Sequence, residues 1–292
     1  MKKLLFIINP NSGKKKSKSD LIDALVSFSA HYQVEVYCTT KQLDCLQMIQ
    51  NKGSLYDVIV VSGGDGTLNE AVNGLISCEK KPLLGYIPTG TMNDFSKNFD
   101  LTPSFEQTAK KIVQNRTFKF DIGKINNYYF AYVAAFGAFT NVSYETQREL
   151  KENLGDIAYL LKGVSELPNL KPYHVKMKID EQNYENDVLM GLIVNGYRVS
   201  GMDVIEKDDH LMNDGVFDLI LVEWTDNLLE WIHYPIGLLK PNITAKFVKR
   251  IKAKDIEIDF DSPISWTLDG EKGEENTHFE VNNLPQALEI LY

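Results

Sequence analysis

The chain has 292 residues, 43% hydrophobic and 24% charged, which is the composition of an ordinary globular protein with room for two domains. Its 40 acidic and 31 basic residues give a net charge of −9, and this argues against a general nucleic-acid binder, which would carry a basic footprint. The three cysteines have no metal-ligand spacing and fit a reducing cytoplasm, and no segment approaches the ~20 apolar residues of a membrane span.

Strand and helix patterns alternate along the first 120 residues. Short apolar runs predict strands, and segments with apolar residues three and four apart predict a helix after each strand. The strands are expected at 4–8, 34–39, 58–62 and 83–88, and the helices from Ser19, from Leu43, from about Thr67 and from Phe105. This alternation predicts a parallel sheet with both faces covered by helices.

The pattern changes after about residue 120. Alternating or β-rich runs with turn clusters between them predict antiparallel strands, interrupted by helical stretches near 146–166 and 227–239. We therefore expect an α/β nucleotide-binding domain over 1–122 and a β-rich substrate and catalytic domain over 123–292. The extreme C-terminus is expected to pack back on the first domain, and a cleft is expected between the two.

The segment GGDGT, residues 63–67, joins a predicted strand to a predicted helix. Glycines let backbone N–H groups approach a ligand, and a helix N-terminus favours an anion such as phosphate. Thr67 could cap this helix or bond a phosphate oxygen. Asp65 would repel phosphate unless a cation lay between them, so it predicts Mg²⁺. A tight turn whose Asp accepts backbone N–H bonds fits the same residues.

Two further loops, NPNSG at 9–13 and PTGTMND at 88–94, also follow predicted strands. The carboxyl ends of parallel strands share one sheet edge, where ligands of open α/β sheets bind, so all three loops are expected together. Neither the P-loop pattern nor the G-x-G-x-x-G dinucleotide pattern is complete.

These three segments, in this order and with these gaps, resemble the diacylglycerol kinase catalytic family, and within it the soluble bacterial lipid kinases. The resemblance continues through FDIGKINNYYF, TNVSYET, AYLLKGVSELP, LMNDGVFDLILVE and LDGE, so it spans nearly the whole chain. It implies an α/β domain of the NAD-kinase type, a β-sandwich domain and ATP in the cleft between them. The nucleotide contacts that it implies are Asn9, Pro10, Asn11, Ser12, Gly13, Thr39, Gly64, Asp65, Gly66, Thr67, Leu68, Asn69, Glu70 and Thr91.

The resemblance also assigns acids in the second domain. Glu271 of LDGE is implied as the general base that takes the proton of a lipid hydroxyl, with Asp121 and Asp214 joined to it through water. The segment LMNDGV resembles a structural Mg²⁺ site in which Asp214 gives its carboxylate and Leu211 and Val216 give carbonyl oxygens. An ordinary Asp-Gly turn fits the same segment.

The expected function is that of an ATP-dependent lipid kinase that transfers the γ-phosphoryl group to diacylglycerol and gives phosphatidic acid. Other acceptors, namely phosphatidylglycerol, a sphingoid-type lipid or NAD, and a non-catalytic nucleotide-binding protein are the alternatives. The enzyme is expected in the cytoplasm, transiently at the inner face of the membrane, and the resemblance implies a homodimer. NGYRVSGMDV, residues 195–204, is a candidate for lining the acyl-chain site.

Overall fold

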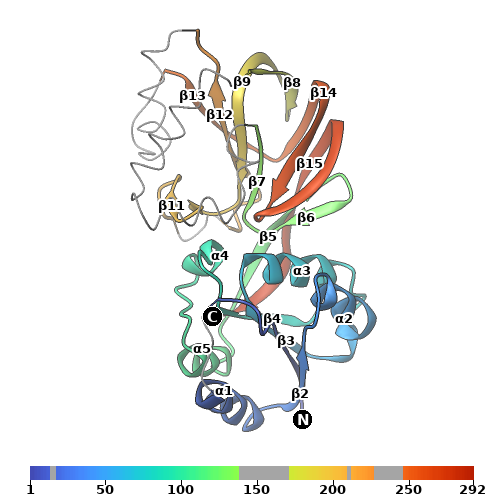
Figure 1. The fold of residues 1–292 in the computed structure, drawn as a ribbon, viewed down its shortest axis with the longest axis vertical. Helices are drawn as coiled ribbons and strands as arrows, with labels where there is room; N and C mark the ends of the chain where they lie inside the picture. The colour runs from blue at the N-terminus through green and yellow to red at the C-terminus, as the bar shows by residue number, and fades with distance from the viewer. Residues whose placement is uncertain (14–17, 138–170, 209–211, 227–245) are drawn as a thin grey trace.

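The structure is a computed structural model that describes residues 1–13, 18–137, 171–208, 212–226 and 246–292. It has two lobes along its longest axis: one combines helices with parallel strands, and the other consists mainly of antiparallel strands (Figure 1). The helical stretches expected at 146–166 and 227–239 lie outside the described residues.

The first lobe contains the alternating elements that the apolar patterns predict. Its sheet order is β4-β3-β1-β2, and every pair in it is parallel. The strands are β1 (Lys3–Ile8), β2 (Gln33–Cys38), β3 (Val58–Gly63) and β4 (Leu83–Pro88). The helices are α1 (Lys18–Ser29), α2 (Asp44–Lys52), α3 (Asp65–Ile76), α4 (Asp94–Lys97) and α5 (Phe105–Ile112), with a 3₁₀ turn η1 (Gly53–Leu55). The short helix α4 and the turn η1 are the elements of this lobe that the sequence did not predict.

Alternate residues of the buried strands supply two cores on opposite faces of this sheet. Leu4 and Phe6 of β1 pack with residues of α1 and α5, whereas Leu5 and Ile7 pack with residues of α2 and α3. Side chains that alternate across a strand require this arrangement, because both faces are covered by helices.

The second lobe is a β-sandwich around an aromatic core that includes Phe136, Trp266 and Phe279. Its larger strands are β5 (Thr117–Ile125), β6 (Tyr128–Phe130), β7 (Val133–Gly137), β8 (Tyr173–Ile179), β9 (Gln182–Val194), β12 (Phe217–Glu223), β13 (Val248–Ala253), β14 (Asp255–Leu268) and β15 (Glu271–Leu291). A separate small hairpin pairs β10 (Arg198–Val199) with β11 (Met202–Asp203).

Strand β15 belongs to both lobes. It pairs antiparallel with β14 and β5, and its last residues then pair parallel with β4, with Ile290 opposite Leu84 and Leu291 opposite Gly85. The extreme C-terminus therefore lies in the first lobe (Figure 1). Strand β15 therefore ties the sandwich to the parallel sheet, with an irregularity in its register to β5 between Leu284 and Leu288.

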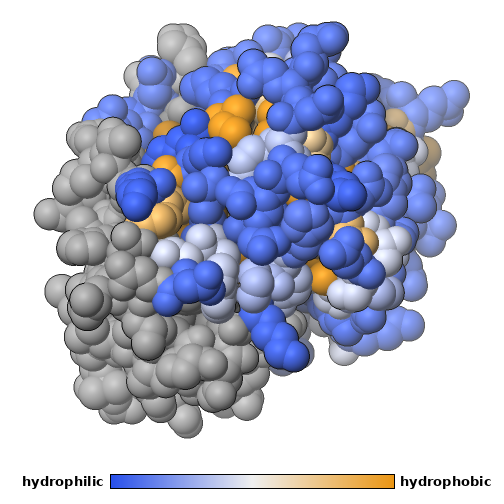
Figure 2. All heavy atoms as spheres, turned by 90° about the horizontal axis from the view of Figure 1, so that it is seen from above, coloured by the Kyte–Doolittle hydropathy of each residue, from blue (hydrophilic) through white to orange (hydrophobic). Residues whose placement is uncertain are grey.

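The described residues at the sandwich end present a mainly hydrophilic surface, with a few apolar residues showing between the polar ones (Figure 2). In the part of the chain that the structure describes, no helix combines the length and the apolar character needed to cross a bilayer.

Candidate active site

Three loops meet at the carboxyl ends of β1, β3 and β4, as the strand order requires. The backbone N–H of Asn9 donates to the carbonyl of Ser62 at 2.8 Å, and that of Thr89 donates to Gly63 at 2.7 Å. A Cβ on Gly13, whose φ is +69°, would clash with the Thr89 carbonyl. We refer to residues 9–13, 63–67 and 88–93 as the three strand-end loops. Their close approach depends on glycine where one backbone lies against another.

Thr67 does not cap the helix that follows GGDGT. The helix begins at Asp65, two residues earlier than expected, and its N-cap Gly64 makes no side-chain cap bond. Thr67 Oγ1 instead accepts a hydrogen bond from Asn9 Nδ2 at 2.9 Å. Thr67 thus fastens loop 63–67 to loop 9–13. Because Gly64 has no side chain, the first N–H groups of α3 remain open to an anion.

Asp65 has one carboxyl oxygen with a donor and one without. Its Oδ2 accepts the backbone N–H of Asn93 at 2.9 Å, while its Oδ1 is buried with no hydrogen-bond partner among the described residues. Burial, and then the neighbouring charge of Asp94, raise the pKa of Asp65 to about 7. A buried, unpaired carboxyl oxygen fits a hard cation, which would supply the missing partner.

Side chains alone do not complete such a cation site in the described part of the chain, where no three His, Cys, Asp or Glu residues are grouped to hold a metal. A Mg²⁺ at Asp65 would take its other ligands from phosphate oxygens and water, as is usual for nucleotide-bound Mg²⁺.

Glu271, the first residue of β15, reaches the strand-end loop 63–67 from the second lobe. A Cβ added to Gly66 would collide with the Glu271 carboxyl, so the glycine admits this approach. The pKa of Glu271 is raised by partial burial of its carboxyl and then by the charges of Glu70 and Asp269. The fold therefore brings Glu271 against the loop that carries Asp65, although the two are about 200 residues apart in sequence.

Asp269 is a buried acid that sequence reasoning missed. Its carboxylate accepts backbone N–H bonds from Ala131 at 2.6 Å, Tyr132 at 2.9 Å and Val133 at 3.1 Å. It also accepts Nδ2 of Asn69 in α3, at 2.9 Å. Asn69, predicted as a nucleotide contact, thus directs its amide towards the second lobe. Nothing in the letters LDGE distinguishes this buried acid from an ordinary turn residue.

Two other predicted nucleotide contacts have side chains engaged elsewhere. The Glu70 carboxylate accepts the backbone N–H groups of Leu43 at 2.9 Å and Cys45 at 3.1 Å, at the beginning of α2. The Leu68 side chain is fully buried in the core beneath α3. The Leu68 backbone N–H is also engaged, since it donates to the Gly64 carbonyl at 3.1 Å.

The other predicted nucleotide contacts lie at or near the strand-end loops. Thr39 is buried just beyond β2, and its backbone N–H donates to Ile8 at 2.9 Å. Thr91 is exposed in loop 88–93, and Ser12 Oγ lies 3.3 Å from Thr89 Oγ1. The position of these residues at one sheet edge is consistent with the nucleotide contacts that the resemblance implies.

Asp121 and Asp214 lie together, but no hydrogen bond joins either of them to Glu271 in the described residues. The Asp121 carboxylate accepts Gln286 N at 2.7 Å and Gly215 N at 2.8 Å, and burial raises its pKa. Asp214 accepts Val216 N at 3.2 Å and pairs with Lys252 at 3.1 Å.

The Asp-Gly turn that the sequence allowed at this position is therefore present, with Gly215 at φ +79°. Leu211, one of the predicted metal ligands, lies outside the described residues. A Mg²⁺ at Asp214 would have to replace Lys252 as the partner of its Oδ2.

The site combines glycine-containing loops at a parallel sheet edge with a buried acid suited to a cation and a second acid from the β-sandwich. This combination is typical of a nucleotide-dependent phosphotransferase. The family comparisons agree. Residues 3–125 match the diacylglycerol kinase catalytic domain, and residues 133–292 match the YegS C-terminal NAD kinase beta sandwich-like domain. The chain belongs to the diacylglycerol kinase catalytic family and is an ATP-dependent lipid kinase. The predicted fold class and enzyme class are confirmed.

Individual relatives match over nearly the whole chain. A diacylglycerol kinase of Staphylococcus epidermidis is 37% identical, and the match covers 99% of this chain and 92% of that protein. One from Staphylococcus aureus strain MRSA252 is also 37% identical over 93% of this chain and 87% of its own length. The crystal structure of a diacylglycerol kinase from Bacillus anthracis strain Sterne superposes with a TM-score of 0.82 at 26% identity, covering 100% of this chain and 97% of its own.

Proposed function

We propose that the enzyme transfers the γ-phosphoryl group of ATP to the free hydroxyl of diacylglycerol and so forms phosphatidic acid. The observation that carries the proposal is the position of Glu271. Its carboxyl group, which has a raised pKa, comes from the second lobe and lies against Gly66 of the strand-end loop 63–67. The acceptor is proposed from the relatives, which are named diacylglycerol kinases.

The first lobe binds the nucleotide. The three strand-end loops present backbone N–H groups and the open end of α3 to the phosphates. Asp65 would hold Mg²⁺ through its unpaired Oδ1. A cation bound there would supply positive charge to the transferring phosphoryl group and would offset the repulsion between the Asp65 carboxylate and phosphate.

The second lobe acts on the acceptor. The Glu271 carboxylate orients the lipid hydroxyl and takes its proton as the hydroxyl oxygen bonds to the γ-phosphorus. The bond from that phosphorus to the bridging oxygen of ADP breaks in line, and ADP leaves with the electron pair. A raised carboxyl pKa makes Glu271 a stronger base than a glutamate of ordinary pKa.

A Glu271→Gln variant tests the role of this residue. It removes the base but keeps the size of the side chain, so we expect turnover to fall ~10²-fold or more while ATP still binds. Glu275→Gln is the matched control, because it neutralises an exposed acid on the same strand. A folded, ATP-binding Glu271→Gln enzyme with full lipid kinase activity would show that Glu271 is not the base.

The acceptor also sets where the enzyme works. Diacylglycerol stays in the bilayer, so the enzyme acts at the membrane surface, transiently and from the cytoplasmic side where ATP is available. We propose that it does so as a homodimer formed through the sandwich lobe, which size-exclusion chromatography with light scattering would test.

A further inference from the structure

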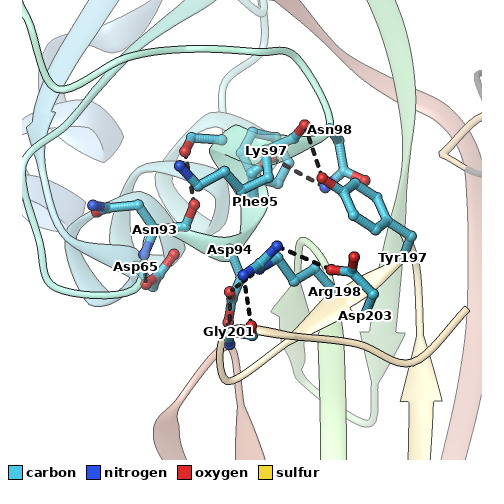
Figure 3. Close-up of polar contacts among 11 residues, drawn as sticks. Asp65, Asn93, Asp94, Phe95, Lys97, Asn98, Tyr197, Arg198, Gly201 and Asp203 are labelled. Atoms are coloured by element: carbon cyan, nitrogen blue, oxygen red, sulfur yellow. Dashed lines mark hydrogen bonds and ion pairs between the residues drawn. The ribbon is translucent and has the colours of Figure 1, made fainter. Parts of the chain in front are cut away.

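The hairpin of β10 and β11 extends from the second lobe onto the short helix α4 of the first (Figure 3). Just before the hairpin, Tyr197 donates its hydroxyl to the Lys97 carbonyl at 3.3 Å. This is the segment that the sequence suggested for the acyl-chain site. Tyr197 and Gly201 of this segment contact residues that follow the third strand-end loop, whereas Asn195 bonds to the second lobe.

The hairpin holds a buried acid of the first lobe. Asp94 has 1% of its surface exposed, and its carboxylate accepts the backbone N–H of Gly201 at 2.9 and 3.2 Å. The Nε of Arg198 lies 3.6 Å from Asp94 Oδ1. A buried carboxylate needs such partners to remain in place, because its desolvation is costly.

Arg198 is itself fixed by the hairpin that carries it. Its Nη1 donates to Asp203 Oδ1 at 3.0 Å, and its Nη2 donates to the Gly201 carbonyl at 2.6 Å. The turn between the strands has positive φ at Ser200 and Gly201, which points the Gly201 N–H towards Asp94. The guanidinium fork therefore has a defined orientation, and Arg198 fixes the turn and the acid together.

The acid is one residue away from the nucleotide site. Asn93 donates its backbone N–H to Asp65 Oδ2 at 2.9 Å. Its side chain accepts Gly90 N at 2.9 Å and donates to the Gly90 carbonyl at 2.8 Å. Gly90 packs directly on Gly64. A displacement of Asp94 would therefore shift the Asn93 N–H that binds Asp65. It would also shift loop 88–93, which packs on Gly64.

We propose that Arg198 is a positioning residue for phosphoryl transfer: through Asp94 it holds loop 88–93, and with it Asp65, in register with the lobe that carries Glu271. The inference rests on the proposed function of Asp65 and Glu271. Small displacements of reacting groups are costly to catalysis, so a loosened hairpin lowers the rate of transfer more than it weakens ATP binding. Loops 9–13 and 63–67 supply further phosphate donors, whereas the hydrogen bonds from the hairpin described above reach α4, beyond loop 88–93.

The test compares Arg198→Met, Arg198→Lys and Lys207→Met. Lys207 is the matched control, because it forms an exposed ion pair across the same two segments, with Asp100 at 3.5 Å. We expect Arg198→Met to lower kcat ~10-fold or more with KM for ATP within about threefold. Arg198→Lys recovers part of kcat, and Lys207→Met stays within about twofold of wild type.

The assay uses whichever acceptor the wild-type enzyme phosphorylates, so a wrong acceptor would overturn the proposed function without deciding the role of Arg198. Wild-type kcat in a folded Arg198→Met enzyme, or an equal loss of ATP affinity and kcat, would overturn the positioning role. If Arg198→Met does not fold, Asp203→Ala decides, because it removes the acceptor of Arg198 Nη1 at an exposed residue. A kcat reduced about threefold or more at unchanged KM for ATP supports the role, and wild-type kcat refutes it.

Discussion

Asn93 and Asp65 are joined by a backbone N–H to carboxylate bond of 2.9 Å that satisfies only one of the two Asp65 oxygens. The other oxygen, Oδ1, is buried without a partner in the described residues. Asn93 is itself in the left-handed region, at φ 53°, and its side chain holds Gly90. The site thus leaves one buried carboxyl oxygen of Asp65 without a partner, while the neighbouring loop fixes the orientation of the carboxyl group.

Asp65→Asn is expected to stabilise the ligand-free protein, increasingly so as the pH rises. Because the pKa of Asp65 is raised to about 7, the folded protein between pH 4 and 7 retains a proton that the unfolded chain has released. Its carboxyl therefore destabilises the fold progressively over this range, and the penalty is fully present above pH 7. The uncharged amide removes this penalty. The stabilisation of Asp65→Asn relative to wild type should therefore be larger at pH 8 than at pH 5, by on the order of 1–2 kcal/mol. Urea unfolding at both pH values measures this, and an equal effect at both would contradict it.

Mg²⁺ is expected to increase the thermal stabilisation by ATP in the wild-type enzyme and to have a smaller effect in Asp65→Asn. A cation bound at Asp65 would supply the partner that Oδ1 lacks, and a ligand that binds only the folded state raises Tm. Melting curves with ATP and either Mg²⁺ or EDTA provide the comparison. A Mg²⁺ effect of the same size in both proteins would place the cation elsewhere.

Glu70→Ala is expected to lower stability rather than ATP affinity. The carboxylate accepts the N–H groups of Leu43 and Cys45, and the N-cap residue Leu43 offers no side-chain cap to α2. Loss of this cap should cost about 1–2 kcal/mol of unfolding free energy. The dissociation constant for ATP should stay within about threefold, and Glu70→Gln should show a milder loss. A tenfold weaker ATP affinity at unchanged stability would instead support a direct nucleotide contact.

Asp269→Ala is expected to destabilise the protein by about 3 kcal/mol or more, because it leaves three buried N–H groups without their acceptor. It also breaks the bond to Asn69 that joins α3 to the sandwich. Asp261→Ala, at an exposed site, is the control and should change stability by no more than about 0.5 kcal/mol. Chemical denaturation measures both, and equal losses would show that Asp269 is not a structural anchor.

The elements of the first lobe could be predicted because local patterns determine them. Val58–Gly63 is a continuous buried run that must be a strand between two covered faces. A glycine-rich segment followed by Leu68, Ala71 and Val72 must turn into a helix. Since parallel strands place their carboxyl ends together, the meeting of the three strand-end loops also followed from the sequence.

Contacts that depend on distant residues could not be predicted. The burial of Asp94 and Asp269 comes from Gly201 and from residues 131–133, which lie more than 100 positions away. The Glu70 carboxylate serves a helix about 25 residues earlier in the chain. Local composition marks all of these acids as ordinary turn or surface residues, because only the tertiary fold desolvates them.

Phosphoryl transfer to diacylglycerol can be measured directly by supplying the purified enzyme with γ-labelled ATP and Mg²⁺. The acceptors are diacylglycerol, phosphatidylglycerol, sphingosine and NAD, each offered separately, with the lipids in mixed micelles. We predict that label appears in phosphatidic acid from diacylglycerol and that Glu271→Gln lowers its rate of formation ~10²-fold or more. Label in NAD or in another lipid, with none in phosphatidic acid, or no transfer to any acceptor by an enzyme that binds ATP, would contradict the proposed function.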